Sequence, residues 1–197
     1  MVRRFVLALL APALLIAPLA RDAHAESRRW VPVPGKSLVG FDASHPLGDF
    51  SGASEQATGE FEGDTADLKK GVTGWLAVAV KTIKTGDNSR DRDTWKAFEP
   101  ERFPEIRFAI ERVESSFPTV SDANDVLLTI HGTLTIHGVS RPMTFPGRIR
   151  LREGKLWVRG ESRIKMSDFG IPPPRRLLLK VQDSVLASFN LNLTPAQ

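Results

Sequence analysis

The segment TIHGTLTIHGV, Thr129 to Val139, alternates polar and apolar residues over most of its length. Side chains alternate between the two faces of a β-strand, so this pattern predicts a strand with one dry face and one polar face. We expect the strand to run from Leu127 to about Gly138. Its polar face would carry three threonines with His131 and His137, and its apolar face would carry Leu128, Ile130, Leu134 and Ile136.

The same alternation recurs along much of the chain. Between Met143 and Arg152 the apolar residues face away from a threonine and three arginines. Leu38–His45, Val72–Val80, Glu105–Arg112 and Val185–Leu193 are patterned in the same way. Short alternating segments separated by glycine and proline are typical of an antiparallel all-β domain. The inward residues expected here include Phe41, Val78, Ile106, Phe108, Ile110, Met143, Phe145, Ile149 and Leu151.

One segment departs from the alternation. DNSRDRDTWKAF, Asp87 to Phe98, begins with two residues that can cap a helix, and Trp95 and Phe98 would share one helical face. We predict one short helix there, covering the sheet. A second irregular segment is GIPPPRR, Gly170 to Arg176. It cannot continue a central strand because proline donates no backbone hydrogen bond, so we expect it at the rim of the fold.

The first 25 residues have the layout of a secretory signal peptide: two arginines, an apolar run and the small-residue box Ala23-His24-Ala25. Cleavage after Ala25 would leave residues 26–197 as one periplasmic domain, a length suited to a single core. This mature chain would carry 24 basic and 22 acidic residues, a balance that does not indicate a nucleic-acid partner. The chain has no cysteine, which excludes disulfides and thiolate metal sites.

The histidines are the first candidates for chemistry. If the strand is continuous, about 20 Å separates His131 from His137, whereas two ligands of one zinc ion each lie about 2 Å from it. The sequence therefore predicts no metal site, and no nucleophile-elbow motif indicates hydrolysis. His45 stands at the end of an apolar row, just before Pro46 and Leu47. His45 could act as a catalytic base at the rim, or it could stabilise a turn. No other residue is a candidate for catalysis, so if His45 only stabilises a turn we expect no enzyme activity.

Basic residues form a second candidate site. If Glu153 and Gly154 make a hairpin turn, the strands on either side present their basic side chains on one outer face. This arginine face could contact anionic lipid head groups on a membrane surface or an acidic partner protein. Equally, it could serve solubility and discourage edge pairing. Its residues are Arg148, Arg150, Arg152, Arg159, Arg163 and Lys165.

Four motifs carry a resemblance to a known family. The strongest is GTLTIHGVSRPMTF, Gly132 to Phe145, with its glycine, leucine-threonine-aliphatic run, Gly-Val and basic residue before proline. The others are FDASHPLGDFSG from Phe41 to Gly52, TGDNSRDRDTWKAFEPERFPEIRF from Thr85 to Phe108, and SDFGI from Ser167 to Ile171. The chain therefore resembles, across essentially the whole mature sequence, the YceI-like family of exported lipid-binding proteins. It departs from the family pattern at Met166, where members often carry arginine, and in having no tyrosine, so polar contacts at the mouth would differ.

The resemblance implies an eight-stranded antiparallel, lipocalin-like barrel with one short helix. Such a barrel is wide enough to hold one small ligand, and the family likeness implies a long hydrophobic chain such as a polyisoprenoid, a quinone-like molecule, or a fatty acid or amide. No cofactor is implied. The inward residues named above are the predicted ligand contacts, and Arg90 and Asp91 would have a structural role, such as an ion pair that fixes the helix.

Two properties stay open at the level of the sequence. The barrel could be hollow, or it could be filled by large inward residues such as Phe41, Phe108, Phe145 and Phe189. The chain could also act alone or as a homodimer.

Overall fold

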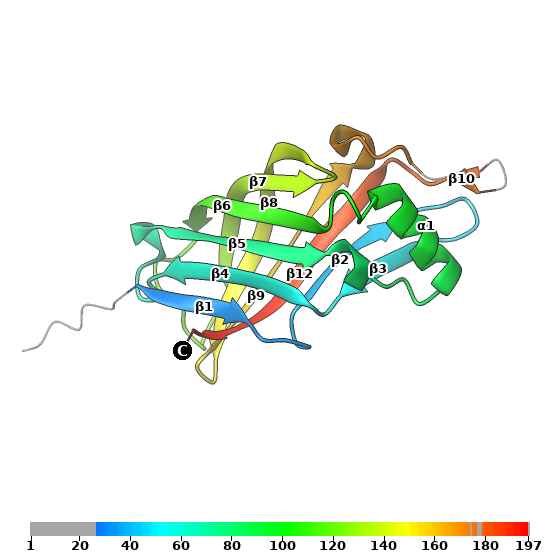
Figure 1. Ribbon diagram of the computed structural model, residues 1–197. Helices are drawn as coiled ribbons and strands as arrows, with labels where there is room; N and C mark the ends of the chain where they lie inside the picture. The colour runs from blue at the N-terminus through cyan, green and yellow to red at the C-terminus, as the bar shows by residue number, and fades with distance from the viewer. Residues whose placement is uncertain (1–26, 174, 177–178, 197) are drawn as a thin grey trace, which may run out of the picture.

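The computed structural model describes residues 27–173, 175–176 and 179–196, so the predicted signal peptide lies outside the described residues. Antiparallel strands wrap into an elongated barrel (Figure 1). Its sheet contains β1 (Arg28–Pro32), β2 (Leu38–Ala43), β3 (Phe50–Ser54), β4 (Ala57–Gly63), β5 (Val72–Ala79), β6 (Glu105–Ser115), β7 (Val126–Ile136), β8 (Val139–Arg152), β9 (Lys155–Lys165) and β12 (Ser184–Pro195).

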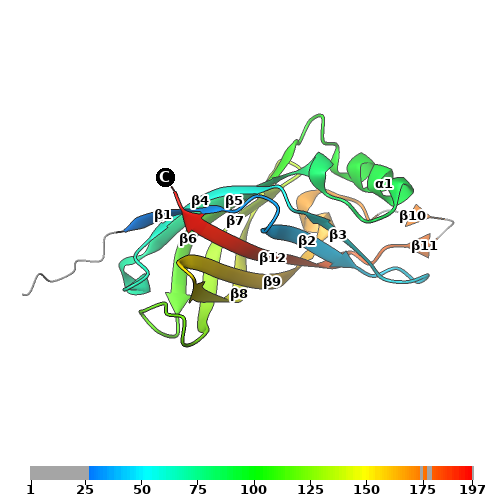
Figure 2. The same cartoon turned by 90° about the horizontal axis from the view of Figure 1, so that it is seen from below.

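These ten strands fill eight positions around the barrel. β1 and β2 both pair antiparallel with β12, β1 through Trp30 opposite Pro195 and β2 through Val39 opposite Phe189, so they form one interrupted strand. β4 pairs with β1 and β3 pairs with β2, so β3 and β4 also share one position in the ring. The sheet continues from β4 through β5, β6, β7, β8 and β9 to β12, and the β1–β12 pairing closes the ring. Figure 2 shows β12 extending from β2 to β1. The predicted eight-stranded antiparallel barrel with one helix is confirmed.

The β7–β8 hairpin follows the predicted alternation except at its end. Leu128, Ile130, Leu134 and Ile136 are all buried. The strand stops at Ile136, and His137 and Gly138 form the turn with φ of 51° and 73°. Two central residues with positive φ make a turn whose twist matches that of the flanking strands. The prediction of a strand reaching Gly138, with His137 on its polar face, is therefore wrong, because the turn takes His137.

The helix α1 (Asn88–Phe98) lies at one end of the barrel, beside β2 and β3 (Figure 1); we call this the helix end. The Asp87 carboxylate caps it by accepting a hydrogen bond from the amide of Arg90 at 2.7 Å. Asp91 does fix the helix, but its ion pair is with Lys84, whose Nζ lies 3.5 Å from Oδ2. The guanidinium of Arg90 instead lies over the ring of Phe50, 5.0 Å from the centroid.

The proline-rich segment also lies at the helix end. There β10 (Arg175–Arg176) pairs with β11 (Leu179–Lys180) in a separate two-stranded sheet (Figure 2). As predicted, this segment does not continue a barrel strand. Its backbone pairing stays outside the ring because consecutive prolines cannot donate to a ladder.

The opposite end, which we call the covered end, is crossed by two connecting segments. The short 3-10 helix η1 (Leu68–Lys70) and the β6–β7 loop meet where the amide of Leu68 donates to Pro118 at 2.7 Å and that of Val120 donates to Thr65 at 2.8 Å. The side chains of Leu68 and Val120 are buried over the barrel interior. This end of the barrel is therefore packed shut. No helix of the described residues is both long enough and apolar enough to cross a membrane.

Candidate functional site

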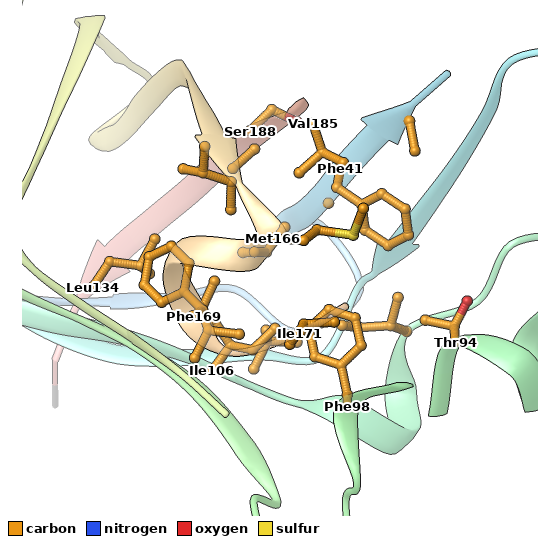
Figure 3. A pocket seen from close by; sticks show the side chains of 18 of the residues that line it. Phe41, Thr94, Phe98, Ile106, Leu134, Met166, Phe169, Ile171, Val185 and Ser188 are labelled. Atoms are coloured by element: carbon orange, nitrogen blue, oxygen red, sulfur yellow. The ribbon is translucent and has the colours of Figure 1, made fainter. Parts of the chain in front are cut away.

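The barrel interior at the helix end contains a cavity of about 130 Å³, the helix-end chamber (Figure 3). Its wall comes from residues of β2, β3, β5, β6, β7, β8, β9 and β12, from α1, and from the 3-10 helix η3 (Met166–Phe169). Thr94 and Ser188 are the polar side chains among the described residues that line it, and no charged residue does. Burying apolar surface is favourable and non-directional, so this wall suits an apolar ligand.

A second cavity of about 70 Å³, the covered-end chamber, lies deeper in the barrel. It is lined by residues of β4, β5, β6, β7, β8, β9 and β12, together with Trp30 of β1 and Leu68 of η1. Its wall is also apolar, apart from Glu62 and Thr65 at its edge. The interior is therefore neither a continuous tunnel nor fully packed.

The predicted ligand contacts divide between the two chambers. Met143 and Leu151 line neither; both are partly buried against the core, and Met143 also borders a shallow outer groove beside Arg141. The helix-end chamber takes Phe41, Val78, Ile106, Phe108, Leu134, Ile136 and Phe145, and the covered-end chamber takes Phe108, Ile110, Leu128, Ile130 and Ile149.

Part of the chamber wall comes from residues that the sequence reasoning missed. The SDFGI motif folds into η3, and its Phe169 and Ile171 side chains are each only 1% exposed and point into the helix-end chamber (Figure 3). Ser167 holds this turn in place: its amide donates to Asp183 Oδ1 at 2.9 Å and its hydroxyl donates to Oδ2 at 2.6 Å. A 3-10 turn has no period-two pattern, so alternation could not reveal it.

The helix presents a different face from the one predicted. Thr94, Ala97 and Phe98 line the chamber, because residues three and four apart share a helical face. Trp95 does not line it; Lys84 Nζ lies 4.3 Å from the centroid of its ring. Of the two residues predicted to share a helical face, Phe98 lines the chamber and Trp95 does not, and Thr94 and Ala97 line it beside Phe98.

Contacts of His137 fix the C-terminal end of α1 to the β7–β8 turn. Its Nε2 lies 3.5 Å from Oε1 of Glu99, the C-cap of the helix, and its ring centroid lies 4.3 Å from that of Phe103. The hydrogen bond from Arg102 to Glu99, with help from His137, holds the pKa of that carboxyl below its usual value despite partial burial. The His137 side chain therefore positions the helix beside the chamber.

Among the described residues, the other two histidines contact their own turn, for His45, and the neighbouring strands, for His131. His45 Nδ1 accepts a hydrogen bond from the amide of Leu47 at 3.1 Å, so the imidazole stabilises the turn after β2. His131 Nδ1 lies 3.2 Å from the Thr144 hydroxyl on the neighbouring strand. Neither residue lines either chamber. In the described part of the chain, no three His, Cys, Asp or Glu side chains come together in a group that could hold a metal ion.

The arginine face is present on β8 and β9, which form the predicted hairpin around Glu153 and Gly154. Arg148 stands opposite Leu127 and Arg159, and Arg150 stands opposite Trp157. Leu127 and Trp157 are 56% and 42% exposed. Two exposed apolar side chains thus lie among the basic ones. Asp125 offsets part of the charge, with oxygens 3.5 Å from Arg148 Nη1 and 3.7 Å from Arg150 Nε.

Solved structures with the same fold include BcnA and a polyisoprenoid binding domain. The chain superposes on Burkholderia cenocepacia BcnA with a TM-score of 0.68 and 18% identity, covering 82% of this chain and 98% of that one. A polyisoprenoid binding domain from Saccharophagus degradans, implicated in plant cell wall breakdown, gives a TM-score of 0.65 and 15% identity over 85% of this chain and 98% of that one. At these identities the likeness shows the fold.

Comparison of the sequence with family models and curated proteins identifies the family. A UPF0312 protein of Pseudomonas putida strain W619 is 29% identical over 127 residues, which are 58% of this chain and 62% of the relative. The chain thus spans about three fifths of the length of the curated relatives it matches. Residues 30–193 match the YceI-like domain over nearly all of the barrel. From Trp30 in β1 to Leu193 in β12, this chain belongs to the YceI-like domain family.

Proposed function

We propose that the protein binds a long hydrophobic chain, such as a polyisoprenoid, a quinone-like molecule or a fatty acid or amide, and carries or stores it in the barrel. The observation that carries this proposal is the wall of the helix-end chamber, which has no charged residue and only two polar side chains among the described residues. Burial of each CH₂ group contributes about 0.8 kcal/mol. A chain can therefore bind well without a charged anchor.

The geometry favours insertion from the helix end. Leu68 and Val120 pack over the covered end, whereas the helix-end chamber is bounded by α1 and by the first residues of β12. Thr94, on the chamber side of α1, places a hydroxyl where a polar head could lie while the chain extends inward (Figure 3). The polyisoprenoid binding domain of Saccharophagus degradans, which has the same fold, supports a ligand of this class.

The decisive experiment is native mass spectrometry of protein purified without detergent, followed by solvent extraction and titration with added prenols and fatty acids. We expect a bound apolar chain, or one-to-one uptake of an added chain. Ala97→Phe would fill the chamber from α1 and reduce uptake at least about tenfold, whereas Lys96→Phe, on the exposed face of the same helix, would not. An empty protein that refuses every added chain would contradict the proposal.

We also propose that the protein acts in the periplasm after cleavage at Ala25. The layout of the first 25 residues supports export. Mass measurement of the protein from a periplasmic extract is the test. A mature chain beginning at Glu26 is expected, and an uncleaved cytoplasmic chain would exclude this location.

We infer a second role for the arginine face, contact with an anionic lipid surface. Trp157 and Leu127 protrude beside Arg148 and Arg159, and an amphipathic indole next to basic groups suits the boundary between head groups and acyl chains. Sedimentation with phosphatidylglycerol vesicles should fall as salt rises. It should fall further with Trp157→Ala but not with Phe117→Ala, another exposed aromatic residue. Vesicle binding that changes neither with salt concentration nor with Trp157→Ala would exclude this role.

A further inference from the structure

The two chambers meet at a layer of large side chains across the middle of the barrel. Leu76, Phe108 and Phe189 line both cavities. Leu76 and Phe108 stand directly opposite each other on β5 and β6, and Phe189 comes from β12, on the other side of the ring. The boundary between the chambers therefore consists of side chains rather than backbone.

A third aromatic ring completes this layer. Phe145 on β8 packs between the other two: its ring centroid lies 5.1 Å from that of Phe108, at an interplanar angle of 70°, and 5.7 Å from that of Phe189, at 58°. Edge-on and tilted ring pairs at such distances are favourable beyond the area they bury. The three rings are each less than 10% exposed. They form a continuous aromatic contact across the interior.

Two glycines make room for these rings. A Cβ at Gly132 would lie 2.8 Å from Phe108 Cζ, and a Cβ at Gly160 would lie 2.6 Å from Phe189 Cζ. Gly132 is on β7 and Gly160 is on β9, each within the ladder beside β6 and β12 respectively. The ring edges thus occupy the space that inward side chains at these two positions would fill. This packing lets each ring extend sideways over the neighbouring strand.

We propose that Phe108, Phe145 and Phe189, with Leu76, form a septum that limits how far an apolar chain enters and so sets the chain length the barrel selects. This inference rests on the proposed function. A chain entering at the helix end gains affinity with each added unit until it meets the septum. Beyond that point the added units stay outside the barrel or must displace the rings, and the gain stops.

The available volume agrees with such a limit. The helix-end chamber, at about 130 Å³, is close in size to an apolar cavity of roughly 150 Å³ that accommodates benzene. It therefore holds only part of a long chain while the septum is closed. Removing one ring would join it to the covered-end chamber of about 70 Å³.

The test is a series of dissociation constants for geraniol, farnesol, geranylgeraniol and solanesol, measured by titration calorimetry or native mass spectrometry. In the unaltered protein we expect affinity to rise with length and then level off. In Phe145→Ala the plateau should move to longer chains, with at least about a tenfold gain for the first prenol beyond the original plateau. Phe145→Leu, a milder truncation, should give the same shift with a smaller amplitude if the alanine variant folds poorly.

Phe61→Leu is the matched control, because Phe61 is also buried and lines the covered-end chamber without bordering the helix-end chamber. It should leave the plateau in place. Affinity that keeps rising through solanesol in the unaltered protein would overturn the septum while leaving chain binding intact. A plateau at the same chain length in the unaltered protein and in both Phe145 variants would do the same. Absence of binding for every prenol and fatty acid would instead remove the proposed function itself.

Discussion

The carboxylate of Asp91 and both donors of Thr85 form a closed contact at the base of α1: Oδ1 accepts from the Thr85 amide at 2.7 Å and from its hydroxyl at 2.8 Å. Asp91 is buried, and Lys84 completes its surroundings. This contact joins the helix to the chain that leaves β5, and it fixes the helix face that presents Thr94 to the chamber.

The Asp91 contact predicts a pH-dependent contribution to stability. Burial raises the pKa of Asp91, but the hydrogen bonds from Thr85 and the charge of Lys84 outweigh burial and hold it below its ordinary value. A lowered folded-state pKa stabilises the protein above the unfolded-state pKa, and this stabilisation is lost as pH falls through the folded-state value. We expect Asp91→Asn to cost about 1 to 3 kcal/mol at neutral pH and progressively less below about pH 4. Urea unfolding across this range, with exposed Asp93→Asn as the neutral control, is the measurement; a cost that does not change with pH would contradict it.

The histidines of the two TIHG repeats should respond differently to substitution by valine: His137→Val should destabilise the protein and His131→Val should not. His137 lies in the left-handed region with φ of 51°, which costs L-residues roughly 1 to 2 kcal/mol and is worst for β-branched side chains. His137→Val should be about 1 to 2 kcal/mol less stable than His137→Asn, since both lose the imidazole but asparagine tolerates this conformation. His131→Val, within β7, should be nearly neutral because valine suits a strand. The measurement is the denaturant midpoint of each variant. An equal loss of stability in His131→Val and His137→Val would be inconsistent with a turn at His137.

Truncation of Phe169 should cost much stability although the residue lies outside the barrel strands. Its side chain is 1% exposed and closes one side of the helix-end chamber. Phe169→Ala should destabilise the protein by about 3 to 5 kcal/mol, through lost burial and the enlarged cavity. Phe117→Ala, at a position 61% exposed, should change stability by less than about 0.5 kcal/mol. Similar unfolding free energies for the two variants would show that η3 is not part of the core.

Lys70 controls the pKa of the Asp64 carboxyl at the covered end. The hydrogen bond from Lys70 Nζ to Asp64 at 2.9 Å, with the amide of Ala66, holds the pKa of Asp64 below its ordinary value despite burial. Lys70→Gln should raise that pKa, and Lys69→Gln should leave it nearly unchanged. Carboxyl chemical shifts followed by NMR against pH give the answer. An unmoved Asp64 titration in the Lys70 variant would exclude the pair as the cause.

Much of the fold follows from local patterns. Alternation within single strands places Leu128, Ile130 and their counterparts inward, because the period of a strand depends only on its own backbone. The cap at Asp87 starts α1 where the sequence predicts, since a carboxylate satisfies an amide only a few residues away. Even so, a local pattern assigns a face and not a neighbour: eleven of the thirteen predicted contacts line a chamber, whereas Met143 and Leu151 are inward yet line neither.

The rest depends on contacts between residues distant in the chain. Alternation makes Phe108, Phe145 and Phe189 inward residues, but only closure of the ring brings β6, β8 and β12 around one interior, so that three rings meet and divide it. Phe169 and Ile171 reach the chamber from a 3-10 turn and the residues after it, held by Asp183. Strand periodicity is a property of neighbouring residues, whereas the shape of a cavity is the space left after side chains from every strand have packed together.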